Sequence, residues 1–338
     1  MLRGFVFGRV ILLIFAISQS TSSSALRPDR PLPRAIASLP DAFEFANKLS
    51  SITSPSPSDS YRLTQTIRVL GQHKQLGTAL SLVQSAVKAK IPLNSHHFVA
   101  LLQACRLNRQ WDIAESLFDR MNRYGVGYST LHCNIMIAIH SEADRVDSIL
   151  STLQFMENRS IPFDAFTLSS AINGCIKGKD LNRALAISEV ALQSEFANNT
   201  FVFNAVLRSF SESRQWERLL ALFCQAVDKR LPLDSVTYSI VISALGETLQ
   251  FELAQTVFES MSNTSTRAVL RDNGVYNSMI VACERSKRWK EAVDYLRRME
   301  HEGLKPDCKT LCSTITCCGN ARQWKVIYVV IYISVIIV

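Results

Sequence analysis

The amino-acid sequence predicts an all-α fold, in which consecutive helix pairs are stacked into a solenoid. Three observations support this prediction: large apolar residues recur every 35 residues, apolar positions within each period follow helical spacing, and proline-containing segments separate the periods. Internal repeats of roughly 20 to 50 residues are typical of solenoids and related arrays. A single helix pair cannot bury its apolar stripes, whereas a stack of neighbouring pairs can.

The 35-residue period is defined by a large apolar residue that opens the second helix of each predicted unit. Consecutive openers are 35 residues apart, except for one interval of 38. Two further columns, three and ten residues after the opener, keep the same register and hold Ala, Ile, Leu or Met. The openers are Leu76, Trp111, Val146, Leu181, Trp216, Phe251, Trp289 and Trp324. Three columns in one register indicate a true repeat.

The segment 200–234 illustrates the two helices of a unit. Phe203, Val206 and Phe210 lie on one stripe of the first helix, and Trp216 opens the second helix after a short break. The unit ends in Leu-Pro-Leu-Asp, and comparable proline-containing segments end three other units. Proline stops a helix because it lacks an N–H group, and the Asp or Asn that follows can cap the next helix.

This register predicts seven complete units and one partial unit. The complete units are 60–94, 95–129, 130–164, 165–199, 200–234, 235–272 and 273–307. The partial eighth unit covers residues 308–325. The unit 235–272 is three residues longer than the others, which we interpret as a loop insertion near Asn263 to Ala268.

The two ends of the chain do not follow the repeat. Residues 1–59 are expected to be a targeting segment followed by a Ser/Pro-rich linker at 50–59. A basic start, an apolar run too short to span a membrane and the absence of acidic residues before Asp29 fit either a secretory signal or an organellar transit peptide. Residues 326–338 form a β-branched apolar tail without a helical stripe, which suggests a truncated or misjoined chain.

Charge and cysteine content restrict the possible chemistry. The net charge is +8, but residues 60–307 contribute only +3, so an anionic partner is permitted rather than required. The nine cysteines form no paired zinc-ligand pattern. Cys105, Cys175, Cys283 and Cys318 share one inward-facing place in the repeat and are expected to be buried and reduced. We find no catalytic constellation or metal motif, and expect no cofactor and no small-molecule substrate.

The repeat resembles the pentatricopeptide repeat family, in its plain 35-residue form. The resemblance is carried by first helices such as Phe-Asn-Ala-Val-Leu (203–207) and Tyr-Asn-Ser-Met-Ile (276–280), and by endings such as Gly-Leu-Lys-Pro-Asp (303–307). Tetratricopeptide repeats have a period of about 34 and a different signature. The resemblance covers residues 60–307 and implies a right-handed superhelical α-solenoid of helix-turn-helix repeats, without enzymatic activity.

The resemblance also implies a function and a location. Members of this family bind single-stranded RNA, one base per repeat, in RNA processing, stability or expression within plant organelles. The first residues are then a transit peptide for the chloroplast or mitochondrion, and a secretory signal is disfavoured. Other RNA-processing proteins are further candidate partners, and no stable membrane insertion is expected. A protein-binding helical scaffold without RNA selectivity is the alternative, because solenoids of this kind also bind proteins.

In this family the fifth and last residues of a repeat together select the base. Amide, hydroxyl and carboxylate groups at these places can contact the Watson–Crick edge of an unstacked base. The resemblance assigns adenine to Thr64–Asn94 and Ser169–Asn199, uracil to Asn134–Asp164, Asn204–Asp234 and Asn277–Asp307, and guanine to Ser239–Asp272. Val99, paired with Ser129, cannot form a hydrogen bond, and Cys312 is uninformative. The implied target is A-any-U-A-U-G-U, from 5′ to 3′.

The second residue of each unit is a candidate for stacking on bases. These residues are Tyr61, His96, Phe166, Phe201 and Val236, whereas Leu131 and Gly274 weaken the column. Contacts to phosphates are expected to be weaker. Lys177 and Arg285 occupy a place where the family often has a basic residue, but Glu142, Glu212 and Glu247 occupy it elsewhere. We therefore expect modest affinity that falls with salt.

Overall fold

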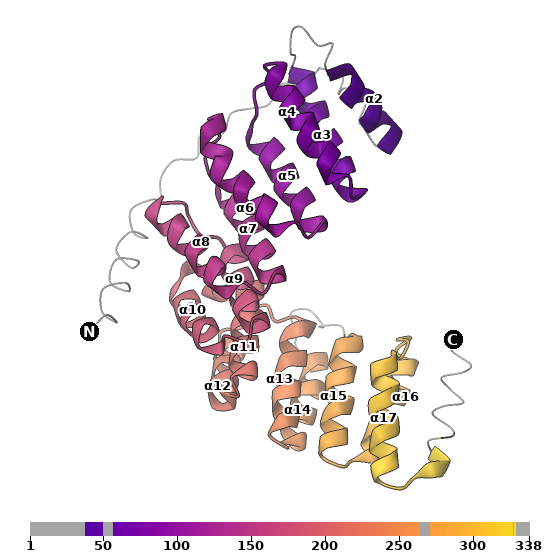
Figure 1. The fold of residues 1–338 in the computed structure, drawn as a ribbon. Coiled ribbons are helices and arrows are strands. Elements are labelled where there is room, and N and C mark those ends of the chain that lie inside the picture. The colour runs from indigo at the N-terminus through magenta and orange to yellow at the C-terminus, as the bar shows by residue number, and fades with distance from the viewer. Residues whose placement is uncertain (1–37, 50–56, 264–270, 327, 329–338) are drawn as a thin grey trace. The chain divides into compact units, whose positions relative to one another are not determined.

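The computed structural model describes residues 38–49, 57–263, 271–326 and 328, and every regular element among them is helical. These elements all belong to one unit, residues 36–338. They follow one another as stacked helix pairs (Figure 1). The predicted all-α solenoid is therefore confirmed for the described part of the chain.

Each complete unit contains two helices of similar length. The first helices are α3 (Pro57–Gln72), α5 (Ser95–Leu107), α7 (Thr130–Glu142), α9 (Ala165–Lys177), α11 (Thr200–Glu212), α13 (Ser235–Glu247) and α15 (Asn273–Arg285). The second helices are α4 (Leu76–Lys88), α6 (Trp111–Arg120), α8 (Val146–Asn158), α10 (Leu181–Gln193), α12 (Trp216–Asp228), α14 (Phe251–Asn263) and α16 (Trp289–His301). Short 3₁₀ turns η1 (Met121–Tyr124) and η2 (Glu195–Asn198) follow α6 and α10, and α17 (Cys308–Asn320) is the first helix of the eighth unit.

Helix α2 (Leu39–Leu49) differs from the prediction, because it lies in the segment 1–59 that we assigned to a targeting segment and a linker. It packs against α3 and α4 and buries Ala42 and Phe45. The start of α3 at Pro57 also falls inside that segment. Helix α2 covers apolar surface of the first unit, which the end of a repeat array requires.

Several predicted features lie outside the described residues. They are most of the targeting segment (1–37), most of the Ser/Pro-rich linker (50–56), the greater part of the predicted insertion (264–270) and most of the apolar tail (327 and 329–338). In the partial eighth unit, α17 is followed by a helical segment that begins at Trp324.

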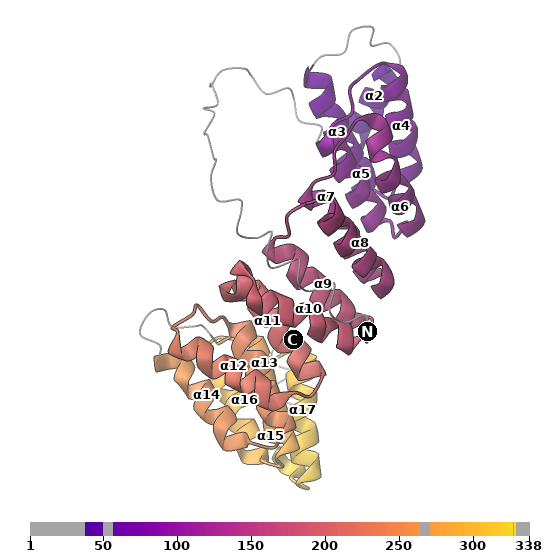
Figure 2. The same cartoon turned by 90° about the vertical axis from the view of Figure 1, so that its left-hand side faces the viewer.

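The core is formed by packing of helices within and between units. Each first helix packs against the first helix of the next unit, and each second helix packs against the first helices of its own unit and of the next. In Figure 2, α4, α6 and α8 lie along one side of α3, α5 and α7. Helices α13 and α15 approach so closely that a Cβ added at Gly246 would lie 2.9 Å from the Cβ of Ala282.

The predicted burial of the four equivalent cysteines is confirmed. Cys105, Cys175, Cys283 and Cys318 are each 0% exposed, and burial raises the pKa of Cys105 to about 12. A thiol in such surroundings behaves as a small apolar side chain.

The turn between the two helices of each unit has one backbone geometry throughout. The turn residues are Lys74, Arg109, Asp144, Lys179, Arg214, Leu249, Lys287 and Arg322, with φ between 54° and 60°. In the turn at Arg214, the N–H of Arg214 donates to Ser211 O at 3.0 Å and that of Gln215 to Phe210 O at 2.8 Å. This is the Schellman arrangement, in which glycine usually occupies the left-handed position.

Replacing Leu249 by glycine is expected to stabilise the protein. Its φ of 57° is unfavourable for a residue with a Cβ, and its side chain is 65% exposed, so few contacts are lost. After allowing for the greater freedom of glycine in the unfolded chain, we expect a gain of about 0.5 kcal/mol in the free energy of unfolding. Leu249→Val is the matched control and should destabilise, because β-branched residues tolerate positive φ poorly. Thermal unfolding of both variants, followed by circular dichroism, measures the difference, and equal midpoints would contradict it.

Candidate nucleic-acid interface

The last residue of each complete unit is the N-cap of the next first helix. These residues are Asn94, Ser129, Asp164, Asn199, Asp234, Asp272 and Asp307. Their backbones are extended, and all except Ser129 accept a hydrogen bond from a backbone N–H of the first helical turn. Capping explains the choice of Asn or Asp at this place, but it does not account for the fifth residue of the unit.

In three units the fifth and last residues are joined directly by hydrogen bonds. The three pairs are Asn134–Asp164, Asn204–Asp234 and Asn277–Asp307. In each, the amide Nδ2 donates to the carboxylate, with every recorded distance at 3.0 or 3.1 Å. The same geometry therefore recurs in alternate units along one surface. The family resemblance predicts that these two residues select a base, and we therefore call the fifth and last residues of a unit its base-selecting pair.

The asparagines of these pairs are more enclosed than the sequence alone indicates. Asn134 is only 4% exposed, and Asn204 and Asn277 are each 9% exposed. The side chains contact the start of the next first helix, so only a small part of each amide is exposed to a ligand. The burial does not leave the amides unsatisfied, because the neighbouring carboxylate accepts from Nδ2.

The carboxylate of Asp307 is held in its charged form. Burial opposes ionisation, but the hydrogen bonds that Asp307 accepts from the backbone N–H and hydroxyl of Thr310 and from Asn277 outweigh it and lower its pKa. Hydrogen bonds to the ionised form of a carboxylate favour that form. Asp307 therefore acts only as an acceptor toward Asn277 at neutral pH.

The remaining predicted pairs are not joined in this way. Thr64 Oγ1 donates to Ser60 O at 3.2 Å, while Asn94 Nδ2 donates to Ser60 Oγ at 3.2 Å, so Ser60 lies between them. Val99 is 8% exposed and has no polar group. Its partner Ser129 instead contacts His132, with 2.8 Å between Oγ and Nδ1.

The two serine-containing pairs are also separate. Ser169 Oγ donates to Phe166 O at 3.2 Å, and the side chain of Asn199 caps α11. Ser239 Oγ lies 3.3 Å from Ser278 Oγ, whereas Asp272 accepts a hydrogen bond of 2.6 Å from Ser235. Asp272 is exposed, so oxygen lone pairs of its carboxylate remain accessible to a ligand.

The second residues of the units form an exposed row beside the base-selecting pairs. Tyr61 is 42% exposed, Phe166 54%, Phe201 76% and Val236 41%, and His96 is also exposed. Leu131, which we expected to weaken the row, is 51% exposed and adds an apolar surface to it. Large apolar side chains that stand in solvent at a fixed period are candidates for ligand contact.

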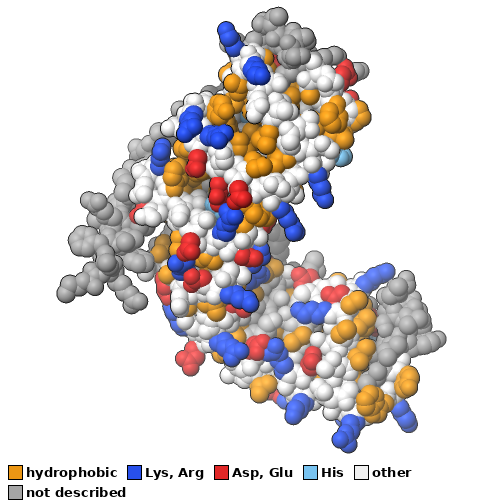
Figure 3. All heavy atoms as spheres, in the orientation of Figure 1, with side chains coloured by type: hydrophobic (Ala, Val, Ile, Leu, Met, Phe, Trp, Pro, Cys, Tyr) orange, Lys and Arg blue, Asp and Glu red, His pale blue; other side chains and the backbone are white. Residues whose placement is uncertain are grey.

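The expected phosphate ligands are engaged within the protein. Lys177 Nζ lies 3.1 Å from Asp144 Oδ1, and Arg285 forms an ion pair with Glu247. Each partner belongs to the preceding unit, so the charges of Lys177 and Arg285 are already compensated. In Figure 3, basic and acidic side chains are interspersed over the visible face.

Sequence reasoning missed a second set of basic residues. Six of the eight turn residues are basic, namely Lys74, Arg109, Lys179, Arg214, Lys287 and Arg322. All six side chains are exposed, and none forms an ion pair within the part of the chain that the structure describes. Their signal in the sequence is the recurrence of Lys or Arg two residues before the opener of the second helix. They lie at the far end of each first helix from the base-selecting pair.

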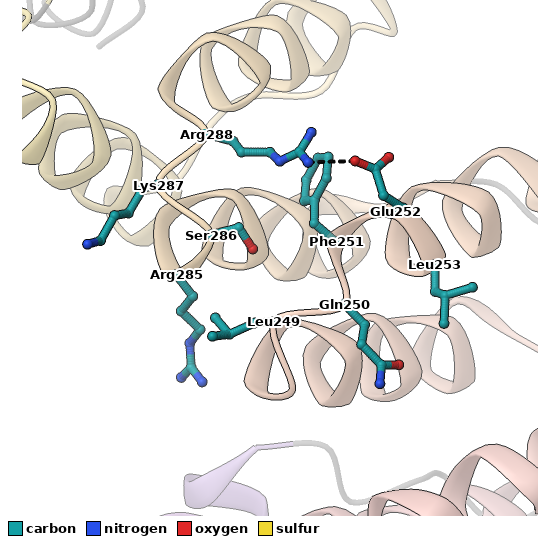
Figure 4. A pocket seen from close by; sticks show the side chains of 9 residues that line it. All are labelled: Leu249, Gln250, Phe251, Glu252, Leu253, Arg285, Ser286, Lys287 and Arg288. Atoms are coloured by element: carbon teal, nitrogen blue, oxygen red, sulfur yellow. Dashed lines mark hydrogen bonds and ion pairs between the residues drawn. The ribbon is translucent and has the colours of Figure 1, made fainter.

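An open hollow of about 570 Å³ lies at two neighbouring turns (Figure 4). It is lined by Leu249 to Leu253 and by Arg285 to Arg288, and Arg288 reaches across Phe251 to Glu252, at 2.5 Å. Enclosed sites for small molecules are mostly apolar, with a few converging polar groups. The charged and exposed lining here does not fit that pattern.

Among the described residues, no helix combines the length and apolar composition needed to cross a lipid bilayer. In the same residues, no three His, Cys, Asp or Glu side chains lie together in a way that could hold a metal ion.

Sequence profiles identify the repeat. A profile described as pentatricopeptide repeat-containing protein matches residues 63–191. A profile of the PPR repeat family matches residues 198–247, and a PPR repeat profile matches 236–263 and 274–304.

Known proteins and structures resemble the chain in the same way. A pentatricopeptide repeat-containing protein of Arabidopsis thaliana, At3g58590, is 23% identical over 252 residues, which cover 74% of this chain and 32% of that protein. The Arabidopsis small ribosomal subunit protein mL103 (rPPR7) is 21% identical over 184 residues, which cover 53% of this chain and 42% of that protein. The chain thus spans about a third to two-fifths of the length of these relatives.

A crystal structure of the pentatricopeptide repeat protein PPR10, in complex with an 18-nt psaJ RNA element, shares the fold with a TM-score of 0.69. Its sequence identity is 16%, and the match covers 89% of this chain and 43% of that one. The structure of PPR10 from maize gives a TM-score of 0.60 at 19% identity, over 86% of this chain and 41% of that one. From its repeats and its fold, the chain is a member of the pentatricopeptide repeat family.

Proposed function

We propose that this chain binds single-stranded RNA along the surface formed by the starts of its first helices, one base per complete unit. The observation that carries the proposal is the recurrence of one hydrogen-bonded Asn–Asp pair, with the same distances, in three alternate units. Helix capping alone requires only the aspartate. The asparagine adds a polar group that capping does not need and that a base edge can use.

The proposed target is A-any-U-A-U-G-U, read by the base-selecting pairs in chain order. The exposed second residues, such as Phe166 and Phe201, supply flat or apolar surfaces on which bases stack. Phosphate contact is assigned to the basic turn residues, since Lys177 and Arg285 are paired internally. The RNA backbone would then lie toward the ends of the first helices, with its bases directed toward their starts. Base contacts therefore determine selectivity, and the turn residues contribute an attraction that depends on salt.

The setting we propose is an organelle, either chloroplast or mitochondrion, where the chain would serve RNA processing, stability or expression. A pentatricopeptide repeat-containing protein of Arabidopsis thaliana described as chloroplastic matches the chain, and another relative is a ribosomal protein. The RNA-bound PPR10 structure supports the assignment of RNA as ligand. We infer a plain 35-residue repeat type and a role in binding rather than catalysis.

Fluorescence anisotropy tests the proposal. The full chain would be titrated into a labelled RNA with A-any-U-A-U-G-U and into a matched RNA whose purines and pyrimidines are exchanged, each at about 50 and 200 mM salt. We expect preference for the first RNA at both salt concentrations and weaker binding of both RNAs at the higher one. Equal or absent binding would contradict the proposal and favour a protein-binding scaffold.

A further inference from the structure

Three threonines stand beside the three Asn–Asp pairs. Each is the third residue of the following unit, and they are Thr167, Thr237 and Thr310. The hydroxyl Oγ1 of Thr167 lies 2.6 Å from Asn134 Oδ1, and that of Thr237 lies 2.6 Å from Asn204 Oδ1. Thr310 donates to Asn277 Oδ1 in the same way. The Oδ1 atom of each amide thus accepts a hydrogen bond from a threonine hydroxyl, while the Nδ2 atom donates to the carboxylate of the pair.

The atoms of this cluster fix the orientation of the amide. An ionised carboxylate only accepts hydrogen bonds, so the end of Asn204 that faces Asp234 is the Nδ2 donor. The opposite end, Oδ1, then receives the hydroxyl hydrogen of Thr237, which is shared with Asp234 Oδ1 at 2.8 Å. Thr237 is 0% exposed, so no solvent molecule competes for this hydrogen bond.

The threonine occurs only with the Asn–Asp combination. In the other four complete units, the third residue of the following unit is His97, His132, Val202 or Val275, and the base-selecting pair is not Asn–Asp. Capping does not require threonine here, because Asp272 caps α15 in front of Val275 with a hydrogen bond of 3.0 Å. The association in three units out of three, and in none of the other four, points to a role tied to the asparagine.

We propose that Thr167, Thr237 and Thr310 are positioning residues that make their units selective for one base. Each holds its asparagine so that a bound base meets an N–H donor and not the carbonyl oxygen. This inference rests on the proposed RNA-binding function. Without the hydroxyl, the carboxylate still holds Nδ2 but Oδ1 is left as a free acceptor, so the unit offers a base both a donor and an acceptor and discriminates less.

The first test removes the hydroxyls and then restores them. The triple variant Thr167→Val, Thr237→Val and Thr310→Val keeps the shape of each side chain but loses the donor. We expect the preference for uracil over the other bases, at the third, fifth and seventh bases of the target, to fall about fivefold or more at each base. The triple Thr→Ser variant keeps the hydroxyl and should retain the preference.

A matched control addresses stability. Thr66 and Thr152 are buried threonines that donate to carbonyls of their own helices at 2.8 Å and lie outside the base-selecting pairs. The double variant Thr66→Val and Thr152→Val should therefore bind RNA with unchanged preference, and its thermal midpoint calibrates the cost of losing a buried hydroxyl.

The second test builds the cluster where it is missing. Ser239→Asn creates an Asn–Asp pair with Asp272 but leaves Val275 in the third place. Adding Val275→Thr replaces one buried methyl group by a hydroxyl. We expect the single variant to discriminate weakly among the four bases at the sixth base of the target. The double variant should prefer uracil at that place by about fivefold or more over each of the other three bases.

The outcomes separate the two proposals. Retained preference in the Thr→Val variant, or equal preference with and without Val275→Thr, overturns the role of the threonines while leaving RNA binding intact. An unaltered chain that shows no base preference overturns the proposed function and this inference with it.

Discussion

Replacing the six basic turn residues with glycine is expected to weaken RNA binding roughly a hundredfold or more at low salt. The variant carries glycine at residues 74, 109, 179, 214, 287 and 322. Each phosphate contact on a single strand contributes about 0.7 to the slope of log affinity against log salt, so the loss of six contacts should reduce the slope by about 4. Anisotropy titrations at four salt concentrations measure this slope.

The glycine substitutions separate binding from folding. All six residues have positive φ and exposed side chains, so glycine relieves strain and should raise the thermal midpoint while affinity falls. Weaker binding by a more stable protein cannot be attributed to unfolding.

A pairwise control keeps charge and backbone geometry constant. Lys179→Gly with Arg214→Gly removes one Lys and one Arg from the turns within units. Lys90→Gly with Arg230→Gly removes the same two charges at φ of 55° and 52°, but after the second helices. We expect only the first pair to change the salt slope, by about 1.4. Equal slopes for the two pairs would assign the effect to net charge and contradict a contact at the turns.

Much of the fold could be predicted because the same apolar column recurs at the start of every second helix. All eight predicted openers, from Leu76 to Trp324, are the first residues of helical segments in the structure. A column of apolar residues fixes such a start in every unit at once. Helix α2 belongs to no column and occurs once, so Ala42 and Phe45 carried too weak a signal in an otherwise polar and proline-containing region.

Interactions between units were less accessible from the sequence. Lys177, which we expected to bind phosphate, instead forms an ion pair with Asp144 of the adjacent unit. The contact of Thr237 with Asn204 likewise crosses a unit boundary. When a base is assigned only from the fifth and last residues of one unit, the threonine that the next unit contributes to the same cluster is left out.

Asn204→Ser is expected to change the base preference at one position only, from uracil to guanine at the fifth base of the target. The variant gives the unit 200–234 the same pair, Ser with Asp, that occurs naturally in Ser239 and Asp272. It also removes the two hydrogen bonds, of 3.0 and 3.1 Å, that the amide of Asn204 donates to the carboxylate of Asp234. The freed carboxylate can then accept from the adjacent N1–H and N2–H donors of guanine, an arrangement that uracil lacks.

The size of the change follows from the hydrogen bonds exchanged. One or two net hydrogen bonds favour guanine, so the ratio of guanine to uracil affinity should rise by about tenfold or more. Four RNAs that differ only in the fifth base measure the ratio for Asn204→Ser. Asn134→Ser is the matched variant, and it is measured with four RNAs that differ only in the third base, where its shift is expected. A uniform loss of affinity for all four RNAs in both variants would mean that the asparagines support folding alone. A shift confined to the altered unit would instead place base selection at the asparagine, because neither the stacking row nor the turn residues change.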